Sequence, residues 1–457
     1  MSEIGPAPSG SPLARGFFFN VNFVFFSTLT AYSLTFLYVV LVSRTLGPEG
    51  RGVTALYQAG ISLALALLSF GISPATVYFV GRRDLTPRQA VECGLTITIA
   101  AIALTAAAVY LLLTLFGDKV EGDGVPYWAA VIAVPSVIQY YVIETVLRAM
   151  GRFGARNFME IVLPVTTLGS FLAIELTSGM TVERAVYAWS LSFLPPLLAG
   201  YAMVGASVWP HAPAAPARVF RVLRFGMQAQ LGNLIQFLNY RLDQYLILVF
   251  VSTAGVGLYS VGVSLSEGMW FIAHSVAIVL TTNLTTLDEA YATHTMPVVC
   301  RNTLLVTGLA SIAIGVIAPV GIPLVFGADF HGSVVPFLLL LPGTVALSGT
   351  KILAAYVFSR GRPMINAAIA FVTLIVTLVG DLVLLPILGV PGAAIAASLA
   401  YGTSLALTAL AYRRMSGGSI LEALVPRPSD AHFYIDGVRR ILRRLRPSAS
   451  RGLRQSS

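Results

Sequence analysis

The sequence predicts an all-α, polytopic membrane protein of about 12 transmembrane helices, and three observations support this fold class. Of the 457 residues, 56% are hydrophobic and only 11% are charged, against roughly 25% charged residues in an average soluble domain. The mean hydropathy is +0.81, and a soluble protein of this length does not bury that much apolar surface. The apolar runs are long and continuous, unlike the ~10-residue alternating segments of a membrane β-barrel. The composition therefore argues against a large soluble enzyme and against a disordered chain.

Twelve runs of mostly apolar residues are each long enough for a spanning helix, which takes about 20 residues. In chain order the predicted spans are 17–43, 53–80, 90–116, 126–148, 157–177, 184–207, 221–251, 255–283, 298–326, 332–358, 363–388 and 391–412. Gly and Pro turns mark the breaks, most clearly at 47–50 after the first span and at 389–392 before the last. Because every break is short, no soluble catalytic domain fits between two spans. The first run is too long for the apolar core of a signal peptide, so it is expected to be a retained helix.

The distribution of Lys and Arg predicts how these spans are oriented in the cell's inner (cytoplasmic) membrane. The N-terminal segment and every second loop together hold 13 basic residues, the remaining loops hold four, and the tail after residue 412 holds ten. Basic residues concentrate on the cytoplasmic side of membrane proteins. Both termini are therefore expected in the cytoplasm. The net charge of +9 then indicates topology, and no nucleic-acid partner is expected.

The chain also repeats itself at offsets between 205 and 210 residues. The matched positions are Pro48–Val53 with Thr253–Leu258, Cys93 with Cys300, Gly151-Arg152 with Gly361-Arg362, Asn157 with Asn366, and Gly179 with Gly389. These pairs indicate a duplicated six-helix unit. An even number of helices per unit makes the repeats parallel, with a substrate site in a central cavity between two pseudo-symmetric lobes. The predicted domains are a cytoplasmic N-terminal segment (1–16), an N-lobe of helices 1–6 (17–207), a linker (208–220), a C-lobe of helices 7–12 (221–412) and a basic cytoplasmic tail (413–457).

The tail contains a pattern of its own. Apolar residues recur at helical spacing over 433–446, and five arginines occupy the other face. This pattern predicts a basic amphipathic helix on the anionic lipid of the inner leaflet. The alternative is a mobile basic tail.

Motifs for chemistry on covalent bonds are missing from the sequence. It has no GxxxxGK[ST] segment for ATP, no HExxH, and no Ser, His and Asp set that can be proposed as a triad. We therefore expect a protein that is not an enzyme, with no cofactor other than a coupling ion and no catalytic metal.

Polar residues inside the spans are the candidates for function, because each costs roughly 2.5–3.5 kcal/mol at a helix centre when it is charged. In helix 7, five residues recur at steps of four, four, three and four on one face: Gln228, Gly232, Gln236, Asn239 and Asp243. The symmetry-related helix 1 carries Asn20 and Asn22. These faces are predicted to line a wet cavity. The alternative is hydrogen bonding between packed helices.

Two carboxylates form a candidate coupling site. Asp243 in helix 7 and Asp381 in helix 11 lie at similar predicted depths, roughly 10–12 Å below the outer surface at 1.5 Å per residue. Together they can hold a Na⁺ ion or exchange a proton, and Thr377 lies one turn before Asp381 to add an oxygen ligand. The alternative is that Asp243 only neutralises Arg241 or Lys351.

Other charged residues in or near the spans have separate predicted roles. Glu267 in helix 8 is a candidate proton relay, and the alternative is that it forms a satisfied polar pair with His274 on the same face. Glu144 and Lys351 lie on the symmetry-related helices 4 and 10 and are expected to line the cavity as a facing pair. The candidates to bind a diphosphate, because an Arg fork matches phosphate oxygens, are Arg44, Arg51 and Arg241. For the first two, the alternative is a solvated loop position at the outer surface.

Several segments resemble oligosaccharide flippases of the O-antigen type. The turn Ser43–Gly52 resembles their LGPEGYG-type turn between helices 1 and 2, and Leu242–Tyr245 through Gly257–Ser260 resembles their helix 7–8 signature. Phe326–Phe330 and Gly392–Ala396 are also similar. The resemblance spans about residues 17–412 and places the chain in the multidrug/oligosaccharidyl-lipid/polysaccharide exporter superfamily.

The resemblance implies a secondary transporter that alternates between inward-open and outward-open states. It would flip a polyprenyl-diphosphate-linked oligosaccharide from the cytoplasmic to the outer leaflet for surface polysaccharide biosynthesis, coupled to Na⁺ or H⁺, with carboxylates on helices 7 and 11 among the coupling candidates. Other polysaccharide-assembly membrane proteins are the expected partners. The alternatives are a multidrug or small-molecule cation antiporter of the same superfamily, which the turn between helices 1 and 2 fits poorly, and a membrane glycan polymerase or ligase, for which the loops are short.

Overall fold

The computed structural model describes the backbone of residues 12–120, 125–284 and 289–427. Side chains are described from residue 26 onward, except at 116–124 and at most positions between 271 and 294. Two predictions fall outside this description: the side chains of Asn20 and Asn22, and the amphipathic helix at 433–446.

Within the described ranges all regular structure is helical. In chain order the helices are α1 (Pro12–Leu68), α2 (Ile72–Gly81), α3 (Pro87–Val120), η1 (Tyr127–Ala129), α4 (Ala130–Ala149), α5 (Phe153–Ser178), α6 (Val182–Leu191), α7 (Leu194–Val204), η2 (Ala206–Val208), α8 (Pro216–Phe250), α9 (Thr253–Leu284), α10 (Glu289–Phe326), η3 (Ala328–Ser333), α11 (Val334–Ser359), α12 (Pro363–Leu388), α13 (Val390–Ser416) and α14 (Ile420–Leu424). In the same ranges, eight helices are long and apolar enough to cross a membrane.

These helices form the twelve predicted passes, with three local differences. First, α1 contains two passes that meet at Gly47, whose φ of 66° a residue with a side chain rarely adopts. Second, the second pass is interrupted before α2, at Ser69–Gly71. Third, the sixth pass is divided into α6 and α7, and α7 has Pro195 and Pro196 in its first turn, where proline fits the start of a new helix.

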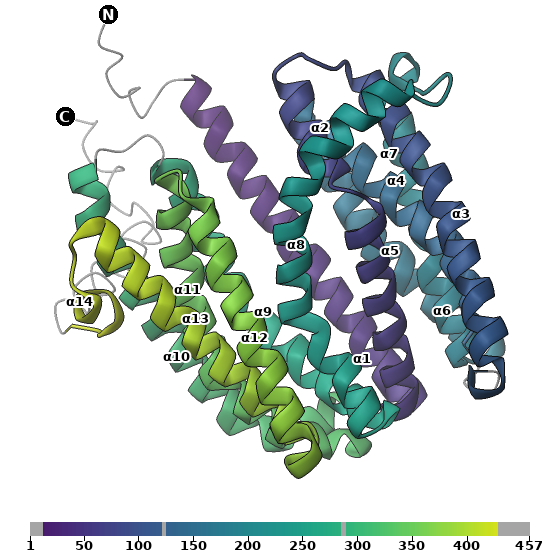
Figure 1. Ribbon diagram of the computed structural model, residues 1–457. Helices are drawn as coiled ribbons and strands as arrows, with labels where there is room; N and C mark the ends of the chain where they lie inside the picture. Colours follow the sequence, from purple (N-terminus) through teal and green to yellow (C-terminus); the bar gives the residue numbers. More distant parts are fainter. Residues whose placement is uncertain (1–11, 121–124, 285–288, 428–457) are drawn as a thin grey trace, which may run out of the picture.

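The passes form two groups of helices. In Figure 1, α2–α7 lie on the right and α9–α13 on the left, and the first pass of α1 and α8 run between them. We call the end at which α1, α5, α8 and α12 begin the upper end, and the end at which α5, α8, α10 and α12 finish the lower end. Each group has its own buried apolar core. Following the sequence analysis, we call the two groups the N-lobe and the C-lobe.

Helix α8 belongs to both lobes. Its upper part packs Val222 into the N-lobe core, where Phe225 stacks on Tyr78 at 4.3 Å between ring centroids. Its lower part packs Ile247 into the C-lobe core. The polar stripe predicted from the sequence lies between these two anchored ends.

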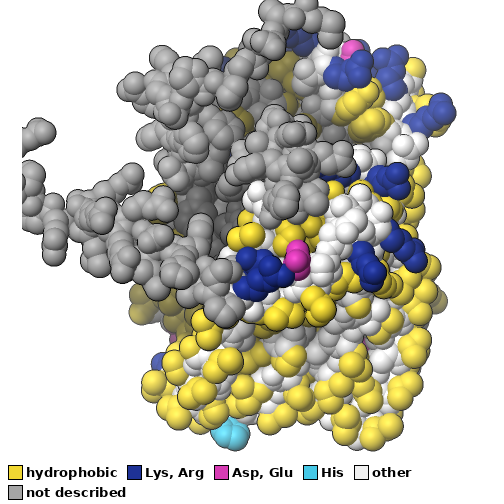
Figure 2. Space-filling view, turned by 90° about the vertical axis from the view of Figure 1, so that its left-hand side faces the viewer, with side chains coloured by type: hydrophobic (Ala, Val, Ile, Leu, Met, Phe, Trp, Pro, Cys, Tyr) yellow, Lys and Arg dark blue, Asp and Glu magenta, His cyan; other side chains and the backbone are white. Residues whose placement is uncertain are grey.

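The surface supports insertion into a membrane. Viewed from the side of the C-lobe, apolar side chains cover the lower part of the molecule, and Lys and Arg side chains gather above them (Figure 2). The helices in the apolar part expose large side chains, such as Val316 and Val320 on α10, which are 76% and 72% exposed. This is the pattern of a lipid-facing belt with a basic side, and the protein is a multi-span membrane protein.

Candidate functional site

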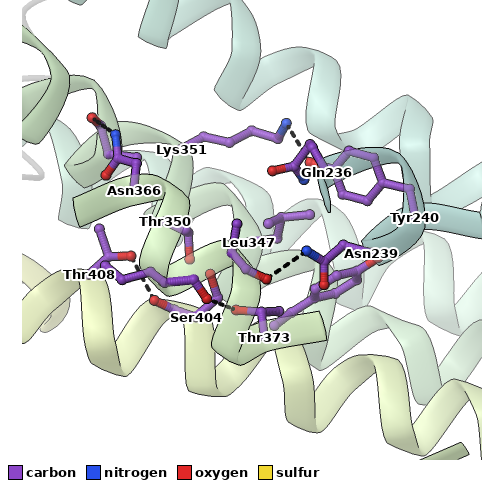
Figure 3. Close-up of a pocket in the computed structure, with 14 residues that line it drawn as sticks. Gln236, Asn239, Tyr240, Leu347, Thr350, Lys351, Asn366, Thr373, Ser404 and Thr408 are labelled. Atoms are coloured by element: carbon purple, nitrogen blue, oxygen red, sulfur yellow. Dashed lines mark hydrogen bonds between the residues drawn. The ribbon is translucent and has the colours of Figure 1, made fainter. Parts of the chain in front are cut away.

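A polar pocket of about 380 Å³ lies in the C-lobe. Its polar lining comes from four helices: Gln236, Asn239 and Tyr240 on α8, Thr350 and Lys351 on α11, Asn366 and Thr373 on α12, and Tyr401, Ser404 and Thr408 on α13 (Figure 3). Asn239 Nδ2 donates to Ala370 O at 2.9 Å, and Asn366 Nδ2 donates to Ala354 O at 3.0 Å. The amide oxygens of Asn239 and Asn366 are buried without a partner. These oxygens are acceptors of the kind that sugar hydroxyls fit.

A second polar pocket of about 660 Å³ lies in the N-lobe, among the first pass of α1, α4, α5 and α6. On its upper side the pocket holds an ionic triad: Arg156 contacts Glu144 at 2.7 Å and Glu160 at 2.5 Å. Thr28 donates its hydroxyl to Glu160 at 3.0 Å. Aromatic side chains complete the lining: Tyr32, Tyr38, Tyr140, Tyr141, Trp189 and Phe193. Aromatic faces beside charged and hydroxyl groups suit a hydrated, ring-shaped ligand.

Sequence reasoning placed Glu144 in the cavity but missed two members of this triad. Arg156 is one of the 13 basic residues counted in the N-terminal segment and every second loop, and Glu160 is not among the predicted site residues. Their spacing of four residues on one helix is a signal that was available, because such residues face each other. Glu144 and Lys351 were expected as a facing pair, but each has its own contacts here. Glu144 binds Arg156, whereas Lys351 lies over two aromatic rings.

Lys351 is the positive charge of the C-lobe pocket. Its Nζ lies 5.2 Å from the ring centroid of Trp270, 5.8 Å from that of Tyr240, and 3.5 Å from the Tyr240 hydroxyl (Figure 3). Among the described side chains no carboxylate pairs with it. The two rings hold the ammonium group through cation–π interactions, which leaves its charge available to an anion in the pocket.

The polar stripe predicted on the seventh pass lies on α8, and its residues occupy different environments along the helix. Gln228 is exposed near the upper end, Gln236 and Asn239 line the C-lobe pocket, and Asp243 is buried. The neighbouring Gln230 donates across to Ala66 O at 2.6 Å. The stripe thus lines a cavity over its middle turns, and a polar residue beside it bonds to a packed helix.

The two predicted carboxylates of the C-lobe lie near each other. Asp243 is 3% exposed and Asp381 is fully buried. Tyr259 donates its hydroxyl to Asp243, and the backbone N–H of Gln244 donates to the other oxygen at 2.8 Å. Both oxygens of Asp381 are buried without a partner, and Asp381 is close enough to Asp243 to be repelled by its charge. Two neighbouring buried carboxylates, of which Asp381 has both oxygens unpartnered, are a fit for a small cation or for a shared proton.

Thr377 and Glu267 relate differently to this pair. Thr377 is buried one turn before Asp381, and its hydroxyl donates to Thr373 O at 3.1 Å, so its oxygen lone pairs remain free to bind a cation. Glu267 pairs with Arg241 at 2.9 Å. The ion-pair partner of Arg241 is therefore Glu267, and among the described side chains no ion pair joins Arg241 to Asp243.

The three predicted diphosphate arginines occupy three environments. Arg241 pairs with Glu267. Arg44 donates to the carbonyl groups of Leu324 and Val325 at the lower end of α10. Arg51 is only 4% exposed, and its Nε and Nη1 have no partner, so it is not the solvated loop residue of the alternative interpretation. Two buried guanidinium nitrogens without a partner are costly.

The lobes meet at the lower end through what we call the lower seal. The lower seal has two parts, an apolar cluster and a contact between Gly52 and Gly257. The cluster comprises Tyr38, Val39 and Val42 on α1, Leu168 and Phe171 on α5, Val261 and Met269 on α9, and Phe326, Phe330 and Phe337 from the segment α10–α11. A Cβ at Gly52 would overlap the carbonyl of Thr253, and a Cβ at Gly257 would overlap the carbonyl of Pro48. The two halves of this contact are related by the 205-residue offset, so it is reciprocal and lies on the pseudo-two-fold axis.

Both polar pockets lie above this seal, since their lining comes mainly from the middle and upper turns of their helices. Two polar pockets on facing lobes, in a helical bundle with a lipid-facing belt, define the class: a polytopic membrane transporter. The chain belongs to the family described as polysaccharide biosynthesis protein, which matches residues 18–266. This membership confirms the resemblance drawn from the turn between the first two passes.

Relatives with named activities are flippases and transporters rather than enzymes. The chain is 21% identical over 398 residues to the probable low-salt glycan biosynthesis flippase Agl15 of Haloferax volcanii, over 84% of this chain and 81% of that one. It is 24% identical over 359 residues to Lsg locus putative protein 1 of Haemophilus influenzae, over 73% of this chain and 82% of that one.

Solved structures confirm the predicted fold class. The lipid II flippase MurJ, in an inward closed conformation, has a TM-score of 0.70 at 10% identity, over 93% of this chain and 96% of that one. A multidrug resistance MATE family transporter of the MOP superfamily, in an inward-facing conformation, has a TM-score of 0.64 at 15% identity, over 85% of this chain and 94% of that one.

Proposed function

We propose that this protein flips a polyprenyl-diphosphate-linked oligosaccharide from the cytoplasmic to the outer leaflet of the inner membrane. The observation that carries the proposal is the pair of polar pockets, about 380 and 660 Å³, on facing lobes above an apolar seal. Pockets of several hundred cubic ångströms lined by amides, hydroxyls and aromatic rings suit an oligosaccharide, whereas the exposed apolar belt keeps a lipid tail in the bilayer. Family membership and the glycan flippase among the relatives support the same substrate class.

The proposal includes an orientation. The upper end, which carries the arginine-rich loops, faces the cytoplasm, in line with the bias of basic residues, and the lower seal closes the outer side. Substrate then enters from the cytoplasmic leaflet, and release requires the lower seal to open while the upper ends of the lobes approach each other. This rocking of two lobes is alternating access.

Charge at three depths supports the transfer of a diphosphate. Lys351 presents an unpaired cation to the C-lobe pocket. Arg241 is paired with Glu267, and Arg51 is buried at the lower seal. We propose that the diphosphate first meets Lys351 and that Arg51 becomes accessible when the seal opens. Asp243 and Asp381 would couple this cycle to Na⁺ or H⁺, since occupation of their site neutralises two buried negative charges.

Replacing Lys351 tests its role as the first anion-binding group. Lys351→Gln is expected to lower the transport rate about tenfold, because a charge-assisted hydrogen bond contributes roughly 1.5–3 kcal/mol, and Lys351→Arg is expected to retain most activity. The measurement is the initial flipping rate in vesicles. The matched control is Arg413→Gln, an exposed residue in the last turn of α13 with the same change of charge. Equal rates for Lys351→Gln and this control would contradict the role.

Reconstitution tests the function itself. Purified protein in vesicles with a labelled polyprenyl-diphosphate oligosaccharide is expected to move the label to the opposite leaflet faster than empty vesicles do. Imposing a Na⁺ gradient and a pH gradient separately then identifies the coupling ion. The small-molecule antiporter is examined in the same vesicles with a fluorescent organic cation. Export of this cation without movement of the labelled lipid would reject the flippase function and support the antiporter function.

A further inference from the structure

A third polar pocket lies outside the two cavities described above. It has a volume of about 610 Å³ and is lined by seven residues from the upper ends of α11, α12 and α13: Tyr356, Arg360, Arg362, Ile365, Ala411, Arg414 and Met415. Three of the seven are arginines, and none of the lining residues in the described part of the chain is acidic. The pocket therefore carries a concentrated positive charge that no acidic lining residue neutralises in the part of the chain that the structure describes.

The polar groups in this pocket lack partners. The Nε and Nη2 atoms of Arg360 are buried without a hydrogen bond, as is the hydroxyl of Tyr356, whose residue is fully buried. The Arg360 guanidinium is held in place, since its Cζ lies 5.1 Å from the centroid of the Tyr356 ring. Buried donors without acceptors are rare in native proteins and indicate a missing water or ion. The two Arg360 nitrogens can only donate and the Tyr356 hydroxyl can donate as well, so an acceptor would satisfy all three groups.

The internal repeat supplies a comparison within the same chain. Arg152 and Arg362 are matched positions in the turns after the fourth and the tenth passes. In the N-lobe, Arg152 Nη1 donates to Met203 O at 2.7 Å and to Val204 O at 3.3 Å, and so caps the end of α7. In the C-lobe, no such bond ties Arg362 to the end of α13 among the described contacts. The same turn is thus satisfied by the protein in one lobe and left open in the other.

The position and the remaining lining identify the ligand class. The three arginines lie where helices end at the upper side, the level expected for lipid headgroups. Three apolar residues, Ile365, Ala411 and Met415, line the same pocket. A planar Arg fork matches phosphate oxygens, and basic pockets between membrane helices on the cytoplasmic side suit anionic headgroups. An amphiphile with a phosphate group satisfies both kinds of lining residue.

We propose that Arg360, Arg362 and Arg414 form an anion site for a phosphate group, supplied by an anionic phospholipid of the adjacent leaflet. The arginines bind the phosphate, Tyr356 adds a hydroxyl donor, and the apolar residues contact the glycerol and the first part of the acyl chains. This site is separate from the two transport cavities. It is independent of which substrate the protein carries.

The test uses the full-length protein in neutral detergent. Isothermal titration calorimetry measures the binding of three ligands: dioctanoyl phosphatidylglycerol, dioctanoyl phosphatidylcholine and inorganic phosphate. The variant Arg360→Gln/Arg362→Gln/Arg414→Gln is expected to bind phosphatidylglycerol at least about tenfold more weakly than the wild type. The matched control is Arg83→Gln/Arg221→Gln/Arg224→Gln, which removes three exposed arginines from the upper end of the N-lobe and is expected to bind as the wild type does.

The outcomes separate the sources of phosphate. Tight binding of phosphatidylglycerol with weak binding of phosphatidylcholine and inorganic phosphate supports the lipid site. Equal binding of inorganic phosphate, lost in the site variant alone, supports the same anion site with a soluble ligand. The charge-conserving variant Arg360→Lys/Arg362→Lys/Arg414→Lys is expected to bind with intermediate affinity, and it serves if the Gln variant does not fold. Equal affinity for phosphatidylglycerol in the wild type and the folded site variant, or an equal loss in the control, overturns the proposal.

Discussion

Asp381→Asn and Asp243→Asn are each expected to abolish transport and to leave membrane insertion intact. Asp381 is fully buried with both oxygens unpartnered, and Asp243 lies close by. A neutral amide has the same shape but neither holds a cation as a carboxylate does nor exchanges a proton. Flipping in vesicles should fall to the level of empty vesicles, and neither variant should restore a flippase-deficient strain.

The melting temperature of the Asp381 variant distinguishes a role in ion coupling from a role in holding the fold together. Two buried carboxylates repel each other, and an uncompensated buried charge is unfavourable. Asp381→Asn is therefore expected to melt at the wild-type temperature or above it, whereas a residue needed for the fold would melt below it. Asp329→Asn, an exposed residue in η3, is the control with the same chemical change. Full complementation of the deficient strain by both site variants would reject the coupling role.

Gly52→Ala and Gly257→Ala are expected to shift the protein away from the conformation described here. A methyl group at either position would overlap a backbone carbonyl of the other lobe, and backbone cannot move aside as a flexible side chain can. Overpacking of this kind costs typically about 1–3 kcal/mol, which changes a two-state equilibrium by roughly 5–150-fold. Since the contact lies between the lobes, the cost falls on the state in which the lower seal is closed.

The measurement is the distance between the lower ends of the lobes. Spin labels at Leu176 on α5 and Ile387 on α12, which are 84% and 73% exposed, report on the N-lobe and the C-lobe, and the two native cysteines are buried. Both glycine variants should show a longer mean distance and a transport rate at least about tenfold lower. Gly60→Ala is the control, because a Cβ at Gly60 meets nothing within 4 Å. A wild-type distance distribution in both variants would show that the seal tolerates a methyl group.

Much of the fold could be predicted because it depends on interactions between near neighbours in the chain. Long apolar runs require spanning helices, and turns such as Gly47-Pro48 break them, since glycine permits a positive φ and proline starts the next helix. The alignment of Pro48–Val53 with Thr253–Leu258 likewise indicated the repeat. Where prediction was incomplete, as in the divided sixth pass, the cause was the local effect of Pro195 and Pro196 in an apolar run.

The candidate site was predicted in part. Asp243, Gln236 and Asn239 were expected on one face from helical spacing, and Asp243 was expected to share a site with Asp381. The partner of Arg241 and two members of the triad, Arg156 and Glu160, were not identified. Opposite charges in a sequence have many possible partners, and the choice among them depends on which helices pack together.

The sequence by itself therefore determined the class of the protein, the number of passes, their repeat and the polar face of α8, since each follows from the period of a helix and the cost of polar groups in lipid. Only the tertiary structure decided that Gly52 touches the other lobe, that Arg51 is buried, and that Arg362 does not cap a helix end as Arg152 does. These outcomes depend on contacts between segments about 50 to more than 200 residues apart. Such contacts arise from the packing of whole helices, and no local pattern specifies them.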